Sequence, residues 1–228
     1  MIWDDIADAY LAVSEDRDKI LLPLLIRIVQ DSDSKTIVDV GGGDGRFLEL
    51  LWTQFGPTRF TAMALTDPSI RMRLRAKERL TRIGAVDIKP DPSDLARGSW
   101  QLALMIAVWM TLETEDRCVS VLRSVHSLLA PAGRLVAAVT HPCFRDRTFH
   151  SYSSTFDMCA YFMSGRRFKV NLYDSARSLT ITDTHWSLAD HARQLRAADF
   201  LIEDLIELPD VQSQAEGSPW LVIVARPV

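Results

Sequence analysis

Four glycines and two aspartates stand close together in the stretch "IVDVGGGDGRF", residues 37–47, at the end of a run of apolar residues. The spacing Asp39-x-Gly41-x-Gly43-x-Gly45 is that of a strand that ends in an acidic residue and turns through glycines into a helix. A backbone without side chains can approach a ligand closely, and a helix start offers free N–H groups. The spacing therefore favours a ligand site that suits an amino-acid moiety.

Two nucleotide-binding motifs do not fit this stretch. A P-loop needs Gly-Lys followed by Ser or Thr, which is absent, and a dinucleotide fingerprint starting at Gly41 needs a third glycine where Arg46 stands. A plain tight turn also explains the glycines, so the other elements of the chain have to decide.

Apolar runs alternate with helical patterns along most of the chain, which is typical of α/β proteins. Several runs are almost continuously apolar, as expected for parallel strands that are covered on both faces. Strands are predicted at 36–41, 60–67, 85–89, 102–108 and 134–140, and helices within 3–30 and at 46–55, 69–83, 115–129 and 187–198. Two last strands, 200–208 and 220–227, are separated by a polar loop and predict an antiparallel hairpin at a sheet edge.

The segment 142–183 departs from this alternation, because it is long, has no clean period and is rich in Phe and Tyr. Long irregular insertions are commonly lids or disordered segments, and disordered segments are poor in aromatic residues. We expect a packed lid here, inserted into one domain that spans residues 1–228.

Composition restricts the class of protein. The formal net charge of -4 and pI of about 5.7 argue against a nucleic-acid binder held by a basic surface. Three cysteines without CxxC spacing suggest neither a disulfide framework nor a zinc site, so no metal is expected. The acidic N-terminus is unlike a signal peptide, and the longest apolar run, "LALMIAVWM", is too short to span a bilayer. These features predict a soluble, cytoplasmic protein that does not bind membranes.

The glycine stretch resembles the first motif of the S-adenosylmethionine-dependent methyltransferases of Rossmann-like fold (class I). "TDPSIRM" resembles the end of that family's second strand, where an acid accepts hydrogen bonds from the ribose hydroxyls, a role that falls on Asp67. "KPDPSDL" resembles the loop after the third strand, which puts Asp91 near the adenine amine. Pro92 has no N–H, so the usual backbone contact is expected to shift to Ser93.

Further segments extend the resemblance. "WQLALMIAVWMTL" is similar to the family's fourth strand, which puts Met105 among the expected cofactor contacts, and "LLAPAGRLV" is similar to the turn into strand five. Tyr10 in "IADAY" resembles a helix-borne tyrosine that caps the cofactor carboxylate, although an aromatic residue on an amphipathic helix also suits the core.

The resemblance implies a doubly wound, seven-stranded, mostly parallel sheet with an antiparallel C-terminal hairpin and an inserted lid. It also implies S-adenosylmethionine as cofactor and methyl transfer to a small-molecule acceptor on O, N or C, in specialised metabolism. Two alternatives stay open. One is an RNA or protein methyltransferase that uses the basic helical face Arg71, Arg75, Arg79 and Arg82, and the other is a protein that binds the cofactor without transferring its methyl group. A homodimer is also left open.

His141 and His185 are the candidates for a general base, because His141 ends the fifth predicted strand and His185 stands where the insertion returns to the domain. Both are expected to face the transferred methyl group. A histidine that packs the lid or orients the substrate is the alternative for each.

Overall fold

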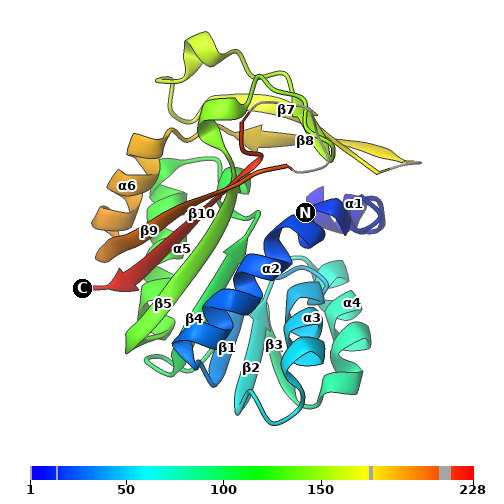
Figure 1. Cartoon of the computed structure of the whole chain (residues 1–228), viewed down its shortest axis with the longest axis vertical. Coiled ribbons are helices and arrows are strands. Elements are labelled where there is room, and N and C mark those ends of the chain that lie inside the picture. Colours follow the sequence, from blue (N-terminus) through cyan, green and yellow to red (C-terminus); the bar gives the residue numbers. More distant parts are fainter. Residues whose placement is uncertain (1, 14, 175–176, 211–216) are drawn as a thin grey trace.

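A seven-stranded sheet forms the centre of the computed structural model, which describes residues 2–13, 15–174, 177–210 and 217–228 (Figure 1). The strand order is β3-β2-β1-β4-β5-β10-β9. The strands are β1 (Thr36–Val40), β2 (Ala62–Thr66), β3 (Val86–Lys89), β4 (Trp100–Ile106), β5 (Leu129–Thr140), β9 (Phe200–Leu208) and β10 (Trp220–Pro227).

The first five strands are parallel, and the last two are not. β1 pairs with β2 and β4, β2 with β3, and β4 with β5, all in parallel, whereas β10 runs antiparallel to both β5 and β9. The predicted fold class, including the C-terminal hairpin, is confirmed. Because β10 starts beside the end of β5, Trp220 pairs with Thr140 at the carboxyl edge of the parallel strands.

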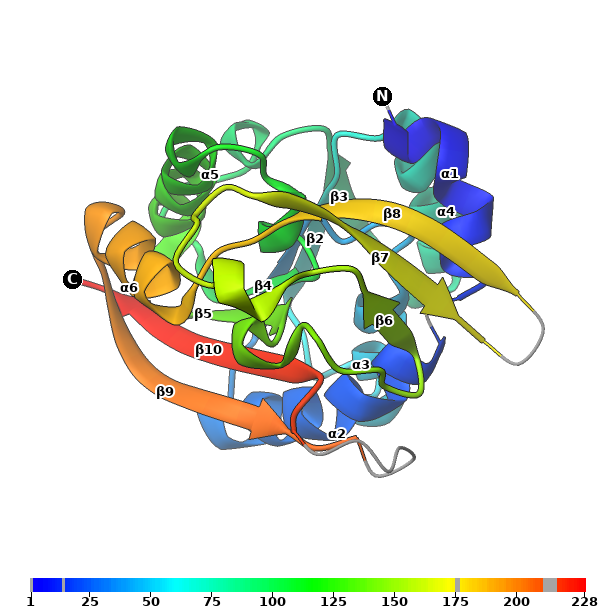
Figure 2. The same ribbon diagram turned by 90° about the horizontal axis from the view of Figure 1, so that it is seen from above.

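Two layers of helices cover the sheet. α2 (Glu15–Ser32) and α3 (Arg46–Phe55) lie on one side, and α5 (Glu115–Leu128) and α6 (Leu188–Ala197) lie on the other (Figure 2). Covering both faces buries the central strands completely, which explains their continuous apolar sequence. Short polar side chains start several helices, as in α6, where Ser187 and Asp190 form a reciprocal capping box.

The first helix, α1 (Ile2–Leu11), packs on α4 (Ile70–Leu80) near the carboxyl edge of the sheet (Figure 1). Asp4 accepts hydrogen bonds from the Ser69 hydroxyl and the Arg71 N–H, and thereby fixes α1 to the start of α4. The short 3-10 helices are η1 (Thr81–Ile83), η2 (Pro92–Asp94), η3 (Trp109–Thr111), η4 (Pro142–Phe144) and η5 (Met158–Ala160). Among the described helices, none has the length and apolar character needed to cross a membrane.

The insertion between β5 and α6 forms a second sheet above the carboxyl edge of the first (Figures 1 and 2). Its antiparallel strands are β6 (Tyr152–Ser154), β7 (Arg167–Tyr173) and β8 (Ser178–Thr184). We call these three strands the insertion sheet. Aromatic side chains, among them Phe149, Phe156 and Phe168, form a small core of their own beneath it. The insertion is therefore packed, as its aromatic content predicts, and it has a regular strand structure that its sequence did not suggest.

Candidate functional site

A cleft opens at the carboxyl ends of β1, β2, β3 and β4, where parallel α/β sheets bind their ligands. It encloses about 1070 Å³, including the open space at its mouth. Its wall contains Asp39, Gly41, Gly42, Gly43, Asp67, Asp91, Pro92, Ile106, Tyr10 and Arg17, among other residues. We call it the cofactor cleft.

The glycine turn forms the floor of this cleft. The N–H groups of Gly41 and Gly42 donate to the Thr66 carbonyl at 2.7 and 3.1 Å, and the Gly43 N–H donates to Asp67 Oδ2 at 3.0 Å. A Cβ on Gly42 would stand 2.6 Å from Asp39 Cγ, so only glycine leaves room there for the Asp39 carboxylate. The turn thus holds the ends of β1 and β2 together and keeps the cleft open to a ligand.

Asp39 is the most unusual group in the cleft. Its side chain is 1 % exposed, and neither of its carboxylate oxygens has a hydrogen-bond partner among the described residues. Burial raises the pKa of Asp39 to about 7, while the charge of Arg17 opposes this rise. A buried carboxylate without a partner is costly. A ligand with a cationic hydrogen-bond donor would remove that cost.

Arg17 and Tyr10 supply the opposite charge and a hydroxyl group. The Arg17 guanidinium donates to Tyr10 Oη at 2.8 Å and to Asp18 Oδ1 at 2.7 Å, and both Arg17 and Tyr10 line the cleft. Arg17 was not singled out in the sequence. The cleft therefore combines a cationic guanidinium with the unpaired Asp39 carboxylate, and a ligand that carries both charges complements it.

Two more acidic residues, which follow Asp39 later in the sequence, line the cleft. Asp67 accepts hydrogen bonds from Gly43 and Ser69 N–H groups, and burial raises its pKa. Asp91 is exposed, and the hydrogen bonds that it accepts from the Ser93 N–H and hydroxyl lower its pKa.

Three residues that the sequence placed in the site do not belong to the described wall of the cleft. Gly45 precedes the first turn of α3 and packs against Leu80, which a Cβ would approach to 2.7 Å. The Ser93 N–H, expected to contact the adenine ring, donates to Asp91 instead. Met105 is fully buried in β4, and its neighbours along the strand, Ile106 and Ala107, line the cleft.

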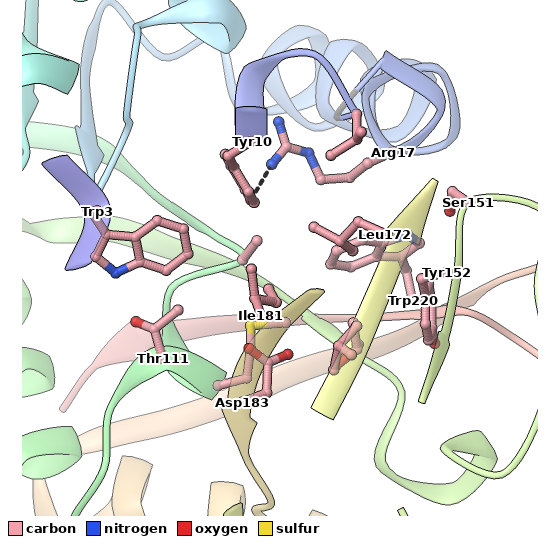
Figure 3. A pocket seen from close by; sticks show the side chains of 15 residues that line it. Trp3, Tyr10, Arg17, Thr111, Ser151, Tyr152, Leu172, Ile181, Asp183 and Trp220 are labelled. Atoms are coloured by element: carbon pink, nitrogen blue, oxygen red, sulfur yellow. Dashed lines mark hydrogen bonds between the residues drawn. The ribbon is translucent and has the colours of Figure 1, made fainter. Parts of the chain in front are cut away.

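A second cavity lies beneath the insertion sheet, and its empty space of about 500 Å³ includes open space at its mouth (Figure 3). We call it the covered cavity. Five residues belong to the walls of both the covered cavity and the cofactor cleft, namely Trp3, Tyr10, Arg17, Ala107 and Thr111. The insertion closes its other side with mostly apolar side chains, including Tyr152, Val170, Leu172 and Ile181. The two spaces are therefore neighbours that share one wall.

Three residues in the wall of the covered cavity each carry a buried polar atom that has no hydrogen-bond partner among the described residues. These atoms are Asp183 Oδ1, Thr140 Oγ1 and Trp220 Nε1, on side chains that are 2 %, 5 % and 4 % exposed. Burial raises the pKa of Asp183 to about 7, and the nearby Arg145 charge opposes the rise. Sequence reasoning missed Asp183 as a site residue. A usable signal was the alternation of β8, which puts Asp183 on the same face as Leu179 and Ile181.

His141 and His185 do not appear in the described wall of either space, contrary to the position expected from the sequence. His141 Nε2 lies 2.8 Å from Glu207 Oε1, and His141 Nδ1 accepts a hydrogen bond from the Cys143 N–H. His185 Nε2 lies 2.7 Å from the Tyr161 carbonyl. Burial lowers the pKa of His141 and lowers that of His185 to about 4. The His141 ring is therefore engaged with β9, and the His185 ring is engaged with the insertion.

Comparison with known proteins identifies the class. A family model described as a methyltransferase domain matches residues 13–179, which is more than half of the chain. The chain therefore belongs to this methyltransferase family, whose Rossmann-like class uses S-adenosylmethionine, and the enzyme class and cofactor predicted from the sequence are confirmed. No curated protein sequence matched the chain.

Solved structures share the fold at low sequence identity. An S-adenosylmethionine-dependent methyltransferase from Clostridium acetobutylicum aligns with a TM-score of 0.67 at 12% identity, over 96% of this chain and 97% of that one. DesVI from Streptomyces venezuelae aligns with a TM-score of 0.65 at 17% identity, over 98% of both chains. The Burkholderia thailandensis 1,6-didemethyltoxoflavin-N1-methyltransferase, with bound 1,6-didemethyltoxoflavin and S-adenosylhomocysteine, aligns with a TM-score of 0.63 at 18% identity, over 97% and 83%.

Proposed function

We propose that this enzyme transfers a methyl group from S-adenosylmethionine to a small molecule held in the covered cavity. One observation carries the proposal: the covered cavity shares a wall with the cofactor cleft and is roofed by the insertion sheet. The sheet, the N-terminal helices and the 142–183 insertion would then work as one methyltransferase domain, with the insertion as its lid.

The cleft fits the cofactor through charge complementarity. In this proposal the unpaired Asp39 carboxylate accepts from the ammonium group of the methionine part, and Arg17, with Tyr10 beside it, faces the carboxylate group. Asp67 takes the ribose hydroxyls, and Asp91 with Pro92 borders the adenine end. The backbone of Gly41 and Gly43 lies along the ligand, and the single atom of a Gly42 side chain leaves Asp39 accessible.

The bound cofactor would supply a methyl group on a sulfonium sulfur. The acceptor lone pair would attack the methyl carbon in line with the carbon–sulfur bond, and the sulfur would leave. The chain's own residues provide position and exclusion of water. Trp3, Tyr10 and Thr111 stand between the two spaces and would orient the acceptor toward the cleft. Tyr152, Leu172 and Ile181 from the insertion would keep solvent out.

A small-molecule acceptor is favoured over RNA or a protein because three of the four arginines on the basic face pair with acids. Arg71 and Arg75 pair with Asp8 at 3.0 and 2.9 Å, and Arg79 pairs with Asp44 at 2.6 Å. These ion pairs reduce the positive charge that the face offers to a phosphate backbone. The Burkholderia enzyme's bound 1,6-didemethyltoxoflavin is a further reason to favour a small acceptor. A cytoplasmic location and a role in specialised metabolism belong to this proposal.

The test is to incubate the purified protein with methyl-labelled S-adenosylmethionine and a cell extract, and to separate small molecules, RNA and protein before counting. We expect label in the small-molecule fraction, with equimolar S-adenosylhomocysteine. Label in RNA or protein would support the alternative acceptors. Bound cofactor that is never demethylated with any fraction would favour a protein that only binds it.

A further inference from the structure

We propose that Asp183 is the catalytic base of the covered cavity and that the acceptor is an alcohol or phenol with a largely apolar, ring-sized body. This inference rests on the proposed function and adds to it a residue and a substrate class. It starts from the three buried polar atoms without partners, whose residues all belong to the wall of one cavity.

The position of Asp183 is set by two sheets. β8 brings it to the underside of the insertion sheet, next to Ile181, and Figure 3 shows its carboxylate among the side chains that line the cavity. Thr140 and Trp220 come from the main sheet, where they are cross-strand neighbours at the ends of β5 and β10. The residues with unpartnered polar atoms therefore come from both the roof and the floor of the cavity, although the rest of its wall is mainly apolar.

Leaving these atoms unpaired costs free energy, which a ligand with matching groups would recover. Asp183 Oδ1 accepts a hydrogen bond, the Trp220 N–H donates one, and the Thr140 hydroxyl can do either. Apolar side chains such as Val170, Leu172 and Ile181 favour a hydrocarbon or aromatic body for the remainder of the ligand. A neutral molecule with one or two polar groups satisfies this set.

A hydroxyl fits better than an ammonium group. It donates to Asp183 and can accept at the same time, whereas an ammonium group only donates and cannot satisfy the Trp220 N–H. The buried Arg145 guanidinium is also close enough to act on Asp183, and it would repel a second cation. Both considerations favour an O–H acceptor over a protonated amine.

The groups around Asp183 come from several elements. Arg145 follows η4, Tyr152 lies in β6, and Tyr10 and Arg17 reach the same cavity from the N-terminal helices. Burial raises the pKa of Asp183 to about 7 against the pull of Arg145. A carboxylate in this range removes a proton more effectively than an ordinary one, which is the requirement for a base that works near neutral pH.

The acceptor oxygen forms a bond to the methyl carbon, the carbon–sulfur bond breaks with its electron pair left on sulfur, and the hydroxyl proton moves to Asp183. A cationic donor, a neutral alcohol and a carboxylate thus become a neutral thioether, a methyl ether and a carboxylic acid. Asp183 then returns its proton to solvent.

The first test measures binding with three probes that share one body: indane, 2-indanol and 2-aminoindane, each titrated by calorimetry in the presence of S-adenosylhomocysteine. We expect 2-indanol to bind about tenfold more tightly than indane, the size expected for a hydrogen bond to a charged group. Asp183→Asn should remove this preference. Asp146→Asn, a carboxylate of the same insertion with a side chain 47% exposed, is the matched control and should keep it.

Equal binding of indane and 2-indanol to the wild type, or an unchanged preference in Asp183→Asn, would overturn the inference. Tightest binding of 2-aminoindane would overturn the hydroxyl assignment. Failure of the wild type to bind S-adenosylhomocysteine would instead contradict the proposed function, so the two failures are distinguishable. Asp183→Asn should keep wild-type affinity for S-adenosylhomocysteine, which also verifies that it folds.

A second readout needs no acceptor. Carbon-13 labelling of aspartate should reveal two side-chain carboxyls that titrate near pH 7, those of Asp39 and Asp183, and one of these two signals should be missing from the spectrum of Asp183→Asn. If the signal lost in this variant titrates near pH 4, the carboxylate is an ordinary one and the assignment of a base is wrong.

Discussion

The cofactor cleft and the covered cavity each contain a buried carboxylate whose pKa burial raises to about 7, yet the two are built in different ways. Asp39 sits at the end of β1, and the glycine turn that follows directly shapes its surroundings. Asp183 sits in β8, and its surroundings come from α1, β5, β6 and β10. The surroundings of Asp39 are formed by a few consecutive residues and can be recognised as a sequence motif. The surroundings of Asp183 depend on how distant segments of the chain pack together.

The electrostatics of the two carboxylates differ as well. Besides burial, Asp67 and Asp44 raise the pKa of Asp39, while Arg17 lowers it. Asp183 has Arg145 as its charged neighbour. We infer that a zwitterionic ligand suits the first site and a neutral, proton-donating ligand the second.

The largest expected effect is on the free energy of unfolding, and it comes from the burial of the Asp183 carboxyl group. The folded pKa of Asp183, about 7, exceeds its ordinary value of 3.8, so between these two pH values the folded state binds a proton that the unfolded state has lost. This stabilisation is complete below pH 4 and is lost as pH rises through 7. The free energy of unfolding of Asp183→Asn, relative to that of the wild type, should therefore rise by about 2–3 kcal/mol as the pH increases from 5 to 8.

Denaturant unfolding at several pH values measures this gain. Asp39→Asn should show a similar gain in the free protein, because Asp39 has a similar pKa. Saturating S-adenosylhomocysteine should reduce the gain for Asp39→Asn and leave that for Asp183→Asn in place. The same response of both variants to the ligand would break the distinction between the two sites.

Gly42→Ala should damage the cofactor cleft selectively. The new Cβ would stand 2.6 Å from Asp39 Cγ and 2.9 Å from Leu65 Cδ1, and overpacking of this kind costs about 1–3 kcal/mol. We expect weaker binding of S-adenosylhomocysteine in calorimetry and unchanged binding of 2-indanol to the protein without cofactor. Gly133→Ala is the control, since its Cβ would also be overpacked, at 2.7 Å from the Trp100 carbonyl oxygen, but Gly133 does not belong to the described wall of the cleft. Loss of affinity in the control as well would point to general destabilisation.

Asp67→Ala should weaken the binding of S-adenosylhomocysteine by about 1–2 kcal/mol, because ribose hydroxyls lose an acceptor and the Gly43 N–H loses its partner. The affinity for 2-indanol should not change. Calorimetric titration of both ligands checks this pair of expectations. An unchanged cofactor affinity would remove Asp67 from the proposed site.

The smallest effects are expected from the two histidines. His141→Gln and His185→Gln should change the single-turnover rate less than about threefold and leave its pH dependence in place, since neither ring reaches the described wall of the covered cavity. His185 has a pKa lowered to about 4, so its contribution to stability is present above pH 6.5 and falls as pH drops toward 4. A lost pH limb in either variant would restore that histidine as the base and contradict the role of Asp183.

The central sheet and the glycine turn were largely predictable, and the reason is local. Continuous apolar strands, helix caps such as Ser187 and the Asp39-to-Gly43 spacing act over a few residues. Their geometry is decided by neighbours in the chain. Boundaries shifted where pairing extended a strand, as in β5, which begins at Leu129 because that residue pairs with Trp100.

Contacts between distant segments decided the rest of the site. Arg17 reaches the cleft because α2 places it against Tyr10, and Met105 is excluded from it because its side chain points into the core. His141 and His185 stand at the expected positions in the chain, but packing turns their rings toward Glu207 and Tyr161. The class of fold and the cofactor turn follow from the sequence alone, since each depends on residues close together in the chain. Which carboxylate lines the covered cavity depends on tertiary packing, because the wall of this cavity is built from segments more than a hundred residues apart in the chain.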